Sequence, residues 1–194
     1  VGAPSLSKPT SVSVQFRYAF VTDSQGLQVI DVTFPERMHA IVGARVPLAD
    51  ARDVYVAKTY AYVSGGAQGL VIVDVTRPTH PEVTQVFDAD GRIRDLSQAK
   101  VASTNDSVFA YLADGVNGLH VVQLISPDDG GRSAYGFSPV PKPQWIATYP
   151  TDSPAIAISK GLDRDRAVDE SGNQVAVFGR IGGRPFNLEE MRRL

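Results

Sequence analysis

The chain has 194 residues, of which 43% are hydrophobic and 21% are charged, and its formal net charge is −2. This composition is ordinary for a globular chain with a core of its own, and the lack of a basic excess argues against a nucleic-acid partner. Without cysteine, the chain has no disulfide, thiolate nucleophile, cysteine-bound zinc or CxxCH haem attachment, and no apolar run approaches the ~18 residues that a membrane helix needs.

Residues 1–10 are predicted to form a lead-in to the fold. Val1-Gly2-Ala3-Pro4-Ser5 shows no signal peptide, which fits a mature N-terminus after cleavage as well as a start inside a longer protein. From residue 11 onward, Val, Ile, Tyr, Phe and Thr are frequent, and the chain has 17 glycines and 13 prolines. This composition predicts β-strands joined by many turns.

Three segments of the chain repeat one another. They read YAFVTDSQGLQVIDVTFP (18–35), YAYVSGGAQGLVIVDVTRP (60–78) and FAYLADGVNGLHVVQLISP (109–127). Their Gly-Leu pairs begin at Gly26, Gly69 and Gly118, 43 and 49 residues apart. Repeats of this period are typical of solenoids and propellers.

Each unit contains the same four predicted strands. An extended run (11–16, 53–57 and 99–103) comes before a strand in which aromatic residues and alanine alternate. A short turn leads to a third, apolar strand, and a proline-bearing loop leads to a fourth. The third strand of the second unit, 69–75, is apolar on both faces, so we expect it to be covered on both sides. Four strands in 40–50 residues indicate a β-propeller blade.

The stretch GLVIVDVTRP (69–78), preceded by TYAYVSGGAQ, resembles the LVIVD repeat of bacterial β-propeller proteins. The first unit keeps GLQVIDVTFP, whereas the third has Gln123 in place of the Asp and reads LISP where the others have Val-Thr-x-Pro. The resemblance covers about residues 11–150. It implies a propeller fold, often an extracytoplasmic setting and sometimes a neighbouring c-type cytochrome, and it implies no catalytic residue set.

The repeat decays after Tyr149. Residues 155–159 resemble the opening strand of a fourth unit and 174–178 its second strand, whereas Gly182-Gly183-Arg184-Pro185 argues against strands in 180–194. Asn187 and Glu190 have capping-box spacing and predict a short helix over 188–194.

We therefore predict an all-β propeller of four-stranded blades, with about three and a half blades in this chain, as part of a larger or multi-chain ring. The expected blades are 11–50, 51–90, 91–150 and a partial blade 151–180, followed by a tail at 181–194. An open propeller leaves strand edges unpaired, which favours completion by further blades.

Asp31 and Asp74 close the third strand in two units. They could ligate a metal or take part in catalysis, or they could accept hydrogen bonds from backbone N–H groups of the following turn. Their recurrence at equivalent positions favours the structural interpretation, because a single active site rarely needs one copy per repeat.

Asp163, Asp165 and Asp169 lie in the most acidic stretch and are a candidate calcium site, since alternate carboxylates can wrap a hard cation. The stretch lacks EF-hand spacing, and Arg164 and Arg166 offer ion pairing as the alternative. The run from Asp88 to Asp95 is a weaker version, in which Asp90-Gly91 predicts a turn.

The three histidines, His39, His80 and His120, occupy non-equivalent positions and do not form a zinc motif. We expect them to be solvated or hydrogen-bonded. The long loop 127–143 carries Arg132, Tyr135 and Phe137, residue types that are enriched at interfaces. This loop is the predicted contact surface, with a flexible insertion as the alternative.

The sequence contains no GxSxG elbow and no phosphate-binding loop. We predict a non-enzymatic scaffold or protein-interaction module, without a cofactor apart from the calcium candidate, in the periplasm or outside a bacterial cell. Its partners would be a protein or further blades. A propeller packed against a multihaem c-type cytochrome is the alternative, and a hydrolase or lyase with a site in the central channel is a third interpretation that lacks a catalytic constellation.

Overall fold

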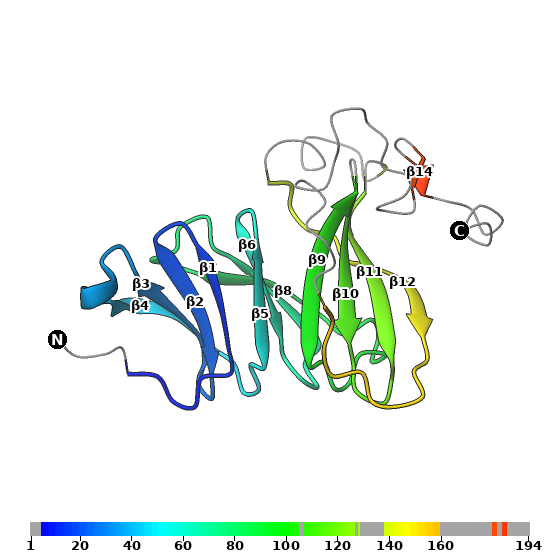
Figure 1. Ribbon diagram of the computed structural model, residues 1–194, viewed down its shortest axis with the longest axis horizontal. Helices are drawn as coiled ribbons and strands as arrows, with labels where there is room; N and C mark the ends of the chain where they lie inside the picture. Colours follow the sequence, from blue (N-terminus) through cyan, green and yellow to red (C-terminus); the bar gives the residue numbers. More distant parts are fainter. Residues whose placement is uncertain are drawn as a thin grey trace. The chain divides into compact units, whose positions relative to one another are not determined.

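The computed structural model describes residues 5–104, 107–126, 128, 138–159, 180–181 and 184–185. The chain divides into two units, Val1–Ile158 and Ser159–Leu194. The first unit contains three four-stranded antiparallel sheets, each formed by consecutive strands (Figure 1). The predicted all-β architecture of repeated propeller blades is confirmed.

Blade 1 consists of β1 (Ser11–Gln15), β2 (Tyr18–Asp23), β3 (Gly26–Asp31) and β4 (His39–Pro47), with a short 3-10 helix η1 (Pro35–Arg37) before β4. Blade 2 consists of β5 (Asp53–Ala57), β6 (Tyr60–Ser64), β7 (Leu70–Asp74) and β8 (Glu82–Phe87). Blade 3 consists of β9 (Gln98–Thr104), β10 (Ser107–Ala113), β11 (Leu119–Ile125) and β12 (Gln144–Tyr149).

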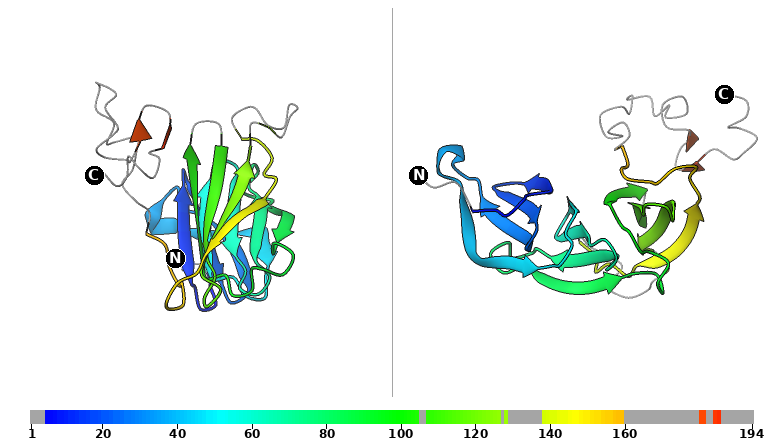
Figure 2. Two further views of the ribbon diagram at one scale, coloured as in Figure 1. Left: turned by 90° about the vertical axis from the view of Figure 1, so that its right-hand side faces the viewer. Right: turned by 90° about the horizontal axis from the view of Figure 1, so that it is seen from below.

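The blades stack face to face. The first strands β1, β5 and β9 are neighbours, and Figure 2 shows blade 2, in cyan and green, between blade 1 and blade 3. One apolar cluster, which includes Phe20, Val54 and Val71, fills the seam between blades 1 and 2. Another, which includes Leu70 and Leu112, fills the seam between blades 2 and 3. Blade 2 therefore buries both faces, as its unbroken apolar third strand predicts.

The repeated Gly-Leu pair is explained by a close backbone approach. Gly26, Gly69 and Gly118 have φ of +124°, +82° and +89°. A Cβ atom at these positions would lie 2.1, 2.5 and 2.4 Å from the carbonyl oxygens of Val46, Phe87 and Tyr149, near or at the ends of the fourth strands. Only glycine combines a left-handed backbone with such proximity.

Residues 155–159 are not a strand, contrary to the prediction. Ala155 forms a single antiparallel bridge with Gly115, through N–H···O distances of 2.8 and 2.9 Å. The N–H of Ile158 then donates to the side-chain Oε1 of Gln98 at 2.7 Å. The backbone groups of this segment thus bond to a turn and a side chain, so no ladder forms. The bridge has a counterpart one blade earlier, between Gly66 and Leu96.

A second prediction about the end of the chain is also wrong. Arg180–Ile181 (β13) and Arg184–Pro185 (β14) pair as a two-stranded antiparallel sheet. Only two residues separate these strands in the sequence, and Gly-Gly is a favoured sequence for so short a connection, which outweighs the expected resistance of this stretch to strands. The predicted strand at 174–178 and the predicted helix at 188–194 lie outside the described residues.

Candidate functional site

Asp31 and Asp74 end the third strands β3 and β7 and bond to the turns that follow. The N–H of Thr33 donates to Asp31 Oδ1 at 2.8 Å, and the N–H of Thr76 donates to Asp74 Oδ1 at 2.7 Å. Hydrogen bonds from the side chain and backbone of Thr33 lower the pKa of Asp31. These are turn contacts of the Asx type.

Asp74 also lines a hollow of about 50 Å³ together with Thr76, Arg77, His80 and Glu82. At this volume the hollow holds little more than a water molecule. Within the described part of the chain, no group of three or more His, Cys, Asp or Glu side chains is placed to hold a metal ion. Asp74 is therefore best described as a turn residue at the edge of a shallow depression.

The other predicted site residues fall outside the described residues. They are the calcium candidates Asp163, Asp165 and Asp169 and the contact-loop residues Arg132, Tyr135 and Phe137. Both sites stay predictions from the sequence.

His120 is the one buried histidine of the three. Its Nε2 lies 3.0 Å from Asp114 Oδ2, and its Nδ1 lies 2.6 Å from Thr148 Oγ1. Asp114, fully buried, also accepts the N–H groups of Arg94 and Asp95. An acid, an imidazole and a hydroxyl in series resemble a catalytic triad, but neither pocket described in this subsection includes Thr148. The chain of hydrogen bonds ties blade 3 to the loop that enters it.

The largest cavity described lies in the seam between blades 2 and 3, and we call it the seam pocket. Its volume is about 180 Å³. Blade 2 contributes the ends of β5 and β6 and their connecting turn, blade 3 contributes β9 to β11, and Ser138 and Pro139 complete the wall. The lining residues are Tyr55, Ala57, Lys58, Tyr60, Tyr62, Val101, Val108, Ile125, Ser138 and Pro139.

The seam pocket lies at a position where the sequences of blades 1 and 2 differ. Gln15 pairs with Tyr18 at the end of β1, and Ala57 pairs with Tyr60 at the end of β5, so the two positions are equivalent. Gln15 reaches across the first seam and donates from Nε2 to the carbonyl of Lys58 at 3.0 Å. Ala57 has only a methyl group at this place, which leaves space in the second seam.

Residues 138–142 hold the two sides of the pocket together. The Ser138 hydroxyl lies 2.5 Å from the Thr59 hydroxyl and accepts the Thr59 N–H at 3.3 Å. Gln85 Nε2 donates to the carbonyl of Pro141 at 2.6 Å, and the N–H of Lys142 donates to the carbonyl of Leu124. This segment therefore bonds to blade 2 and to blade 3 beside the pocket.

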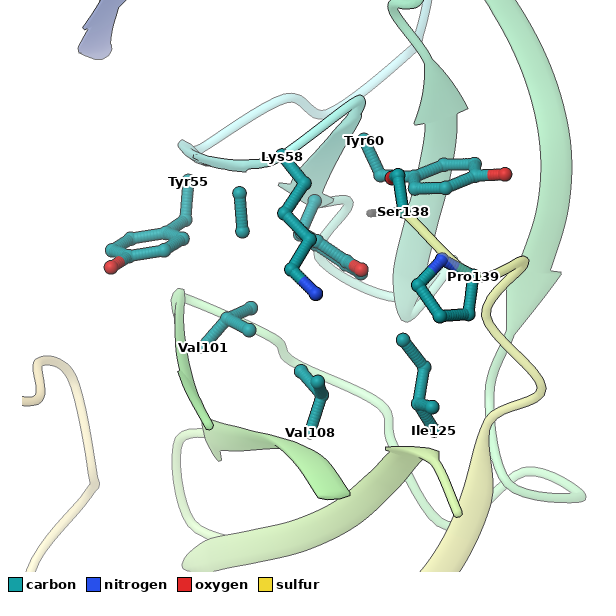
Figure 3. A pocket seen from close by; sticks show the side chains of 10 residues that line it. Tyr55, Lys58, Tyr60, Val101, Val108, Ile125, Ser138 and Pro139 are labelled. Carbon is teal, nitrogen blue, oxygen red and sulfur yellow. The ribbon is translucent and has the colours of Figure 1, made fainter. Parts of the chain in front are cut away.

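Lys58 is the one cation among the residues that line the seam pocket. Figure 3 shows its side chain extending between Tyr55 and Pro139, with the ammonium group above Val108. The backbone of Lys58 is left-handed, with φ of +56°, because it occupies the tight turn between β5 and β6. No carboxylate in the described part of the chain pairs with Lys58.

A ladder of charges lies at the other end of β5. Arg52 donates from Nε and Nη2 to Asp50, just before it in the chain. Its Nη1 donates at 2.6 Å to Asp95, which lies in the loop that leads into blade 3. These carboxylates raise the pKa of Arg52 further above its ordinary value. Lys100 Nζ of β9 lies 3.5 Å from Asp53 Oδ2 of β5. The ladder joins neighbouring blades, and each of its five charged side chains has a partner of opposite charge.

The outward faces of blades 1 and 3, which we call the end faces, resemble in sequence the two faces that blade 2 buries. In blade 1, Val12 pairs with Val21 and Val14 with Ala19; in blade 2 the equivalent pairs are Val54 with Val63 and Val56 with Ala61. Blade 2 packs this face against blade 1. On blade 1 it points away from blade 2, and Val12 and Val14 are 59% and 64% exposed, compared with 3% for Val54.

Blade 3 shows the complementary repeat on its outward face. Tyr111 pairs with Val121 there, as Tyr62 pairs with Ile72 on the face that blade 2 presents to blade 3. Tyr111 and Val121 are half-buried, whereas Tyr62 and Ile72 are 2% and 0% exposed. The two ends of the stack therefore carry the two halves of one blade-to-blade contact.

Among the described residues, no helix has the length and apolarity that crossing a membrane requires. No curated protein and no solved structure matches the chain. Residues 8–38 and 49–88 match the model of the LVIVD repeat family, and these segments contain the first three strands of blade 1 and all four strands of blade 2. These two segments therefore match LVIVD repeats, and β4 of blade 1 lies outside both matches.

Proposed function

We propose that this repeat scaffold is a non-enzymatic interaction module whose end faces dock further blades of the same repeat type, from the same chain or from another. The observation that carries the proposal is the identity of the cross-strand pairs on the outward face of blade 1 and on the buried face of blade 2. A sheet face that is buried between blades loses its apolar contacts with water. Valines left exposed on the same face form an apolar surface, and the packing of a further blade would remove this surface from water.

The segment after blade 3 supports this proposal. The bridge between Gly115 and Ala155 repeats the bridge between Gly66 and Leu96, which leads the chain from blade 2 into blade 3. Residues 155–158 therefore enter along the path that the first strand of a following blade would take.

Substitution of an exposed end-face valine tests the proposal. We expect the purified chain to self-associate with rising concentration, and Val14→Asp to shift it toward the monomer, in light scattering after size exclusion. Val86→Asp is the matched control, because Val86 is similarly exposed, at 57%, on the outer strand of blade 2. A chain that stays monomeric would contradict docking between copies of the chain, and association that both substitutions weaken equally would contradict docking through the end faces.

We also propose a periplasmic or extracellular location in a bacterium, supported by the setting in which the repeat is often found. Detection of the chain in a periplasmic or culture fraction, rather than in the cytoplasm, tests it. We do not extend the proposal to a multihaem cytochrome partner, because no contact among the described residues favours one.

A further inference from the structure

The seam pocket has the size of a small ring-containing ligand. Its volume is about 180 Å³, and an apolar protein cavity of about 150 Å³ accepts benzene. Its walls combine aliphatic side chains with three tyrosines, Tyr55, Tyr60 and Tyr62. Ligand sites are typically concave and mostly apolar, with a few polar groups that fix orientation.

The polar groups of the seam pocket favour an anion. Lys58 supplies a positive charge with no carboxylate partner in the described part of the chain. Burial raises the pKa of Tyr62, and burial together with Asp74 raises that of Tyr60. Both phenols therefore stay protonated at neutral pH, so they do not repel an anion.

The pocket also lies at a position where the second seam differs from the first. The equivalent place in the first seam is taken by Gln15, which bonds to the carbonyl of Lys58. In the second seam Ala57 leaves the space open, while Ser138 bonds to Thr59 beside it. The seam pocket is therefore specific to the second seam.

From these observations we propose that the seam pocket binds a small aromatic carboxylate, with its ring between the tyrosine and valine side chains and its carboxylate on the Lys58 ammonium. Lys58 is exposed, so its charge-assisted contact with the carboxylate forms at the open side of the pocket. The site lies between blades 2 and 3 and does not depend on docking at the end faces.

Benzoate is the test ligand, and benzamide is its uncharged analogue of nearly the same shape. We expect calorimetric titration of the chain to show benzoate binding and benzamide affinity at least about tenfold lower, since a hydrogen bond to a charged group contributes about this factor. Absence of benzoate binding, or equal affinity for the two compounds, would overturn the proposal.

Two variants locate the binding site. Lys58→Met keeps the length of the side chain and removes its charge, and we expect it to lower benzoate affinity about tenfold. Lys8→Met is the matched control, because Lys8 is exposed, has a similar left-handed backbone with φ of +54°, and lies outside the pocket lining. Ala57→Gln, which copies the residue of the first seam, should fill the pocket and abolish binding. If Ala57→Gln does not fold, unchanged benzoate affinity in Lys58→Met still rejects the site.

Discussion

Gly69 lies so close to Phe87 that a methyl group added to Gly69 would be 2.5 Å from the Phe87 carbonyl oxygen. The oxygen belongs to the backbone of the neighbouring strand β8, so relief requires β7 and β8 to separate where they pair. The glycine of the repeated Gly-Leu motif is thus required by its close contact with the fourth strand, and this contact is the same in all three blades.

Gly69→Ala should reduce the free energy of unfolding by about 3 kcal/mol or more, from the left-handed backbone and the clash together. Gly43→Ala is the control, because Gly43 has φ of +79° but no atom within 4 Å of an added Cβ. We expect a loss of only about 1–2 kcal/mol there. Urea unfolding of both variants measures the difference, and equal losses would show that the close approach carries no cost.

The pair formed by buried Asp23 and half-buried Arg45 should make blade 1 sensitive to acid. Burial alone would raise the pKa of Asp23, but hydrogen bonds from Arg45 and from the N–H groups of Ser7 and Gln25 outweigh it and lower the pKa. A carboxylate whose pKa is lower in the folded protein than in the unfolded chain stabilises the fold at pH values above its unfolded pKa, about 3.9. This stabilisation is lost as the pH falls through the folded pKa.

Asp23→Asn should therefore cost about 1–3 kcal/mol at pH 7, because the half-buried Arg45 and the N–H groups of Ser7 and Gln25 lose their charged acceptor. The difference in stability from the unmodified protein should narrow below about pH 4. Chemical unfolding at pH 7 and pH 3 measures both. Arg52→Met provides a contrast: Arg52 is 35% exposed, so its loss should cost about 1 kcal/mol or less and depend on salt. A pH-independent gap for Asp23→Asn would reject the assigned role of its charge.

Asp74→Ala should lower the melting temperature by a few degrees, because the N–H of Thr76 loses its acceptor, which is worth about 1 kcal/mol. Asp74→Asn keeps an acceptor oxygen at the same place and should have a smaller effect. If Asp74→Asn were as damaging as Asp74→Ala, the charge of Asp74 would matter, and a role beyond the turn would have to be sought.

The calcium prediction at Asp163, Asp165 and Asp169 can be tested by thermal unfolding with added calcium and with a chelator. Binding to the folded state alone raises the melting temperature, and tighter binding raises it more. We expect calcium to raise it, the chelator to reverse the change, and Asp163→Asn with Asp165→Asn to remove the response. Identical melting curves with calcium and with chelator would exclude the site.

The sequence predicts the repeat better than it predicts the exceptions to the repeat. The predicted run 53–57 coincides with β5 (Asp53–Ala57), because strand patterns and turn residues are local properties that recur in each blade. The seam pocket was missed: Ala57 looks like an ordinary strand residue until its register shows that it replaces Gln15. The contact of Ser138 with Thr59, 79 residues earlier, depends on tertiary packing that no local pattern encodes.

The failure at 155–159 has a similar cause. The alternation of Ala155 to Ser159 is that of a strand, but a strand needs a partner with free backbone groups. Here Ala155 pairs with Gly115 for one bridge only, and Ile158 bonds to the side chain of Gln98. Local pattern shows what a segment can form, and the neighbouring segment decides whether it does.

Blade 2 packs against a neighbour on both sides, whereas blades 1 and 3 each have one such neighbour within the stack. In a linear array, unfolding begins at the ends and the central unit opens last. Amide hydrogens of β6 and β7 should accordingly exchange with solvent far more slowly than those of β1. Amide exchange in the LVIVD segment (70–74) should then be the slowest in the stack, and its rate should report the opening of the whole stack and not of one sheet.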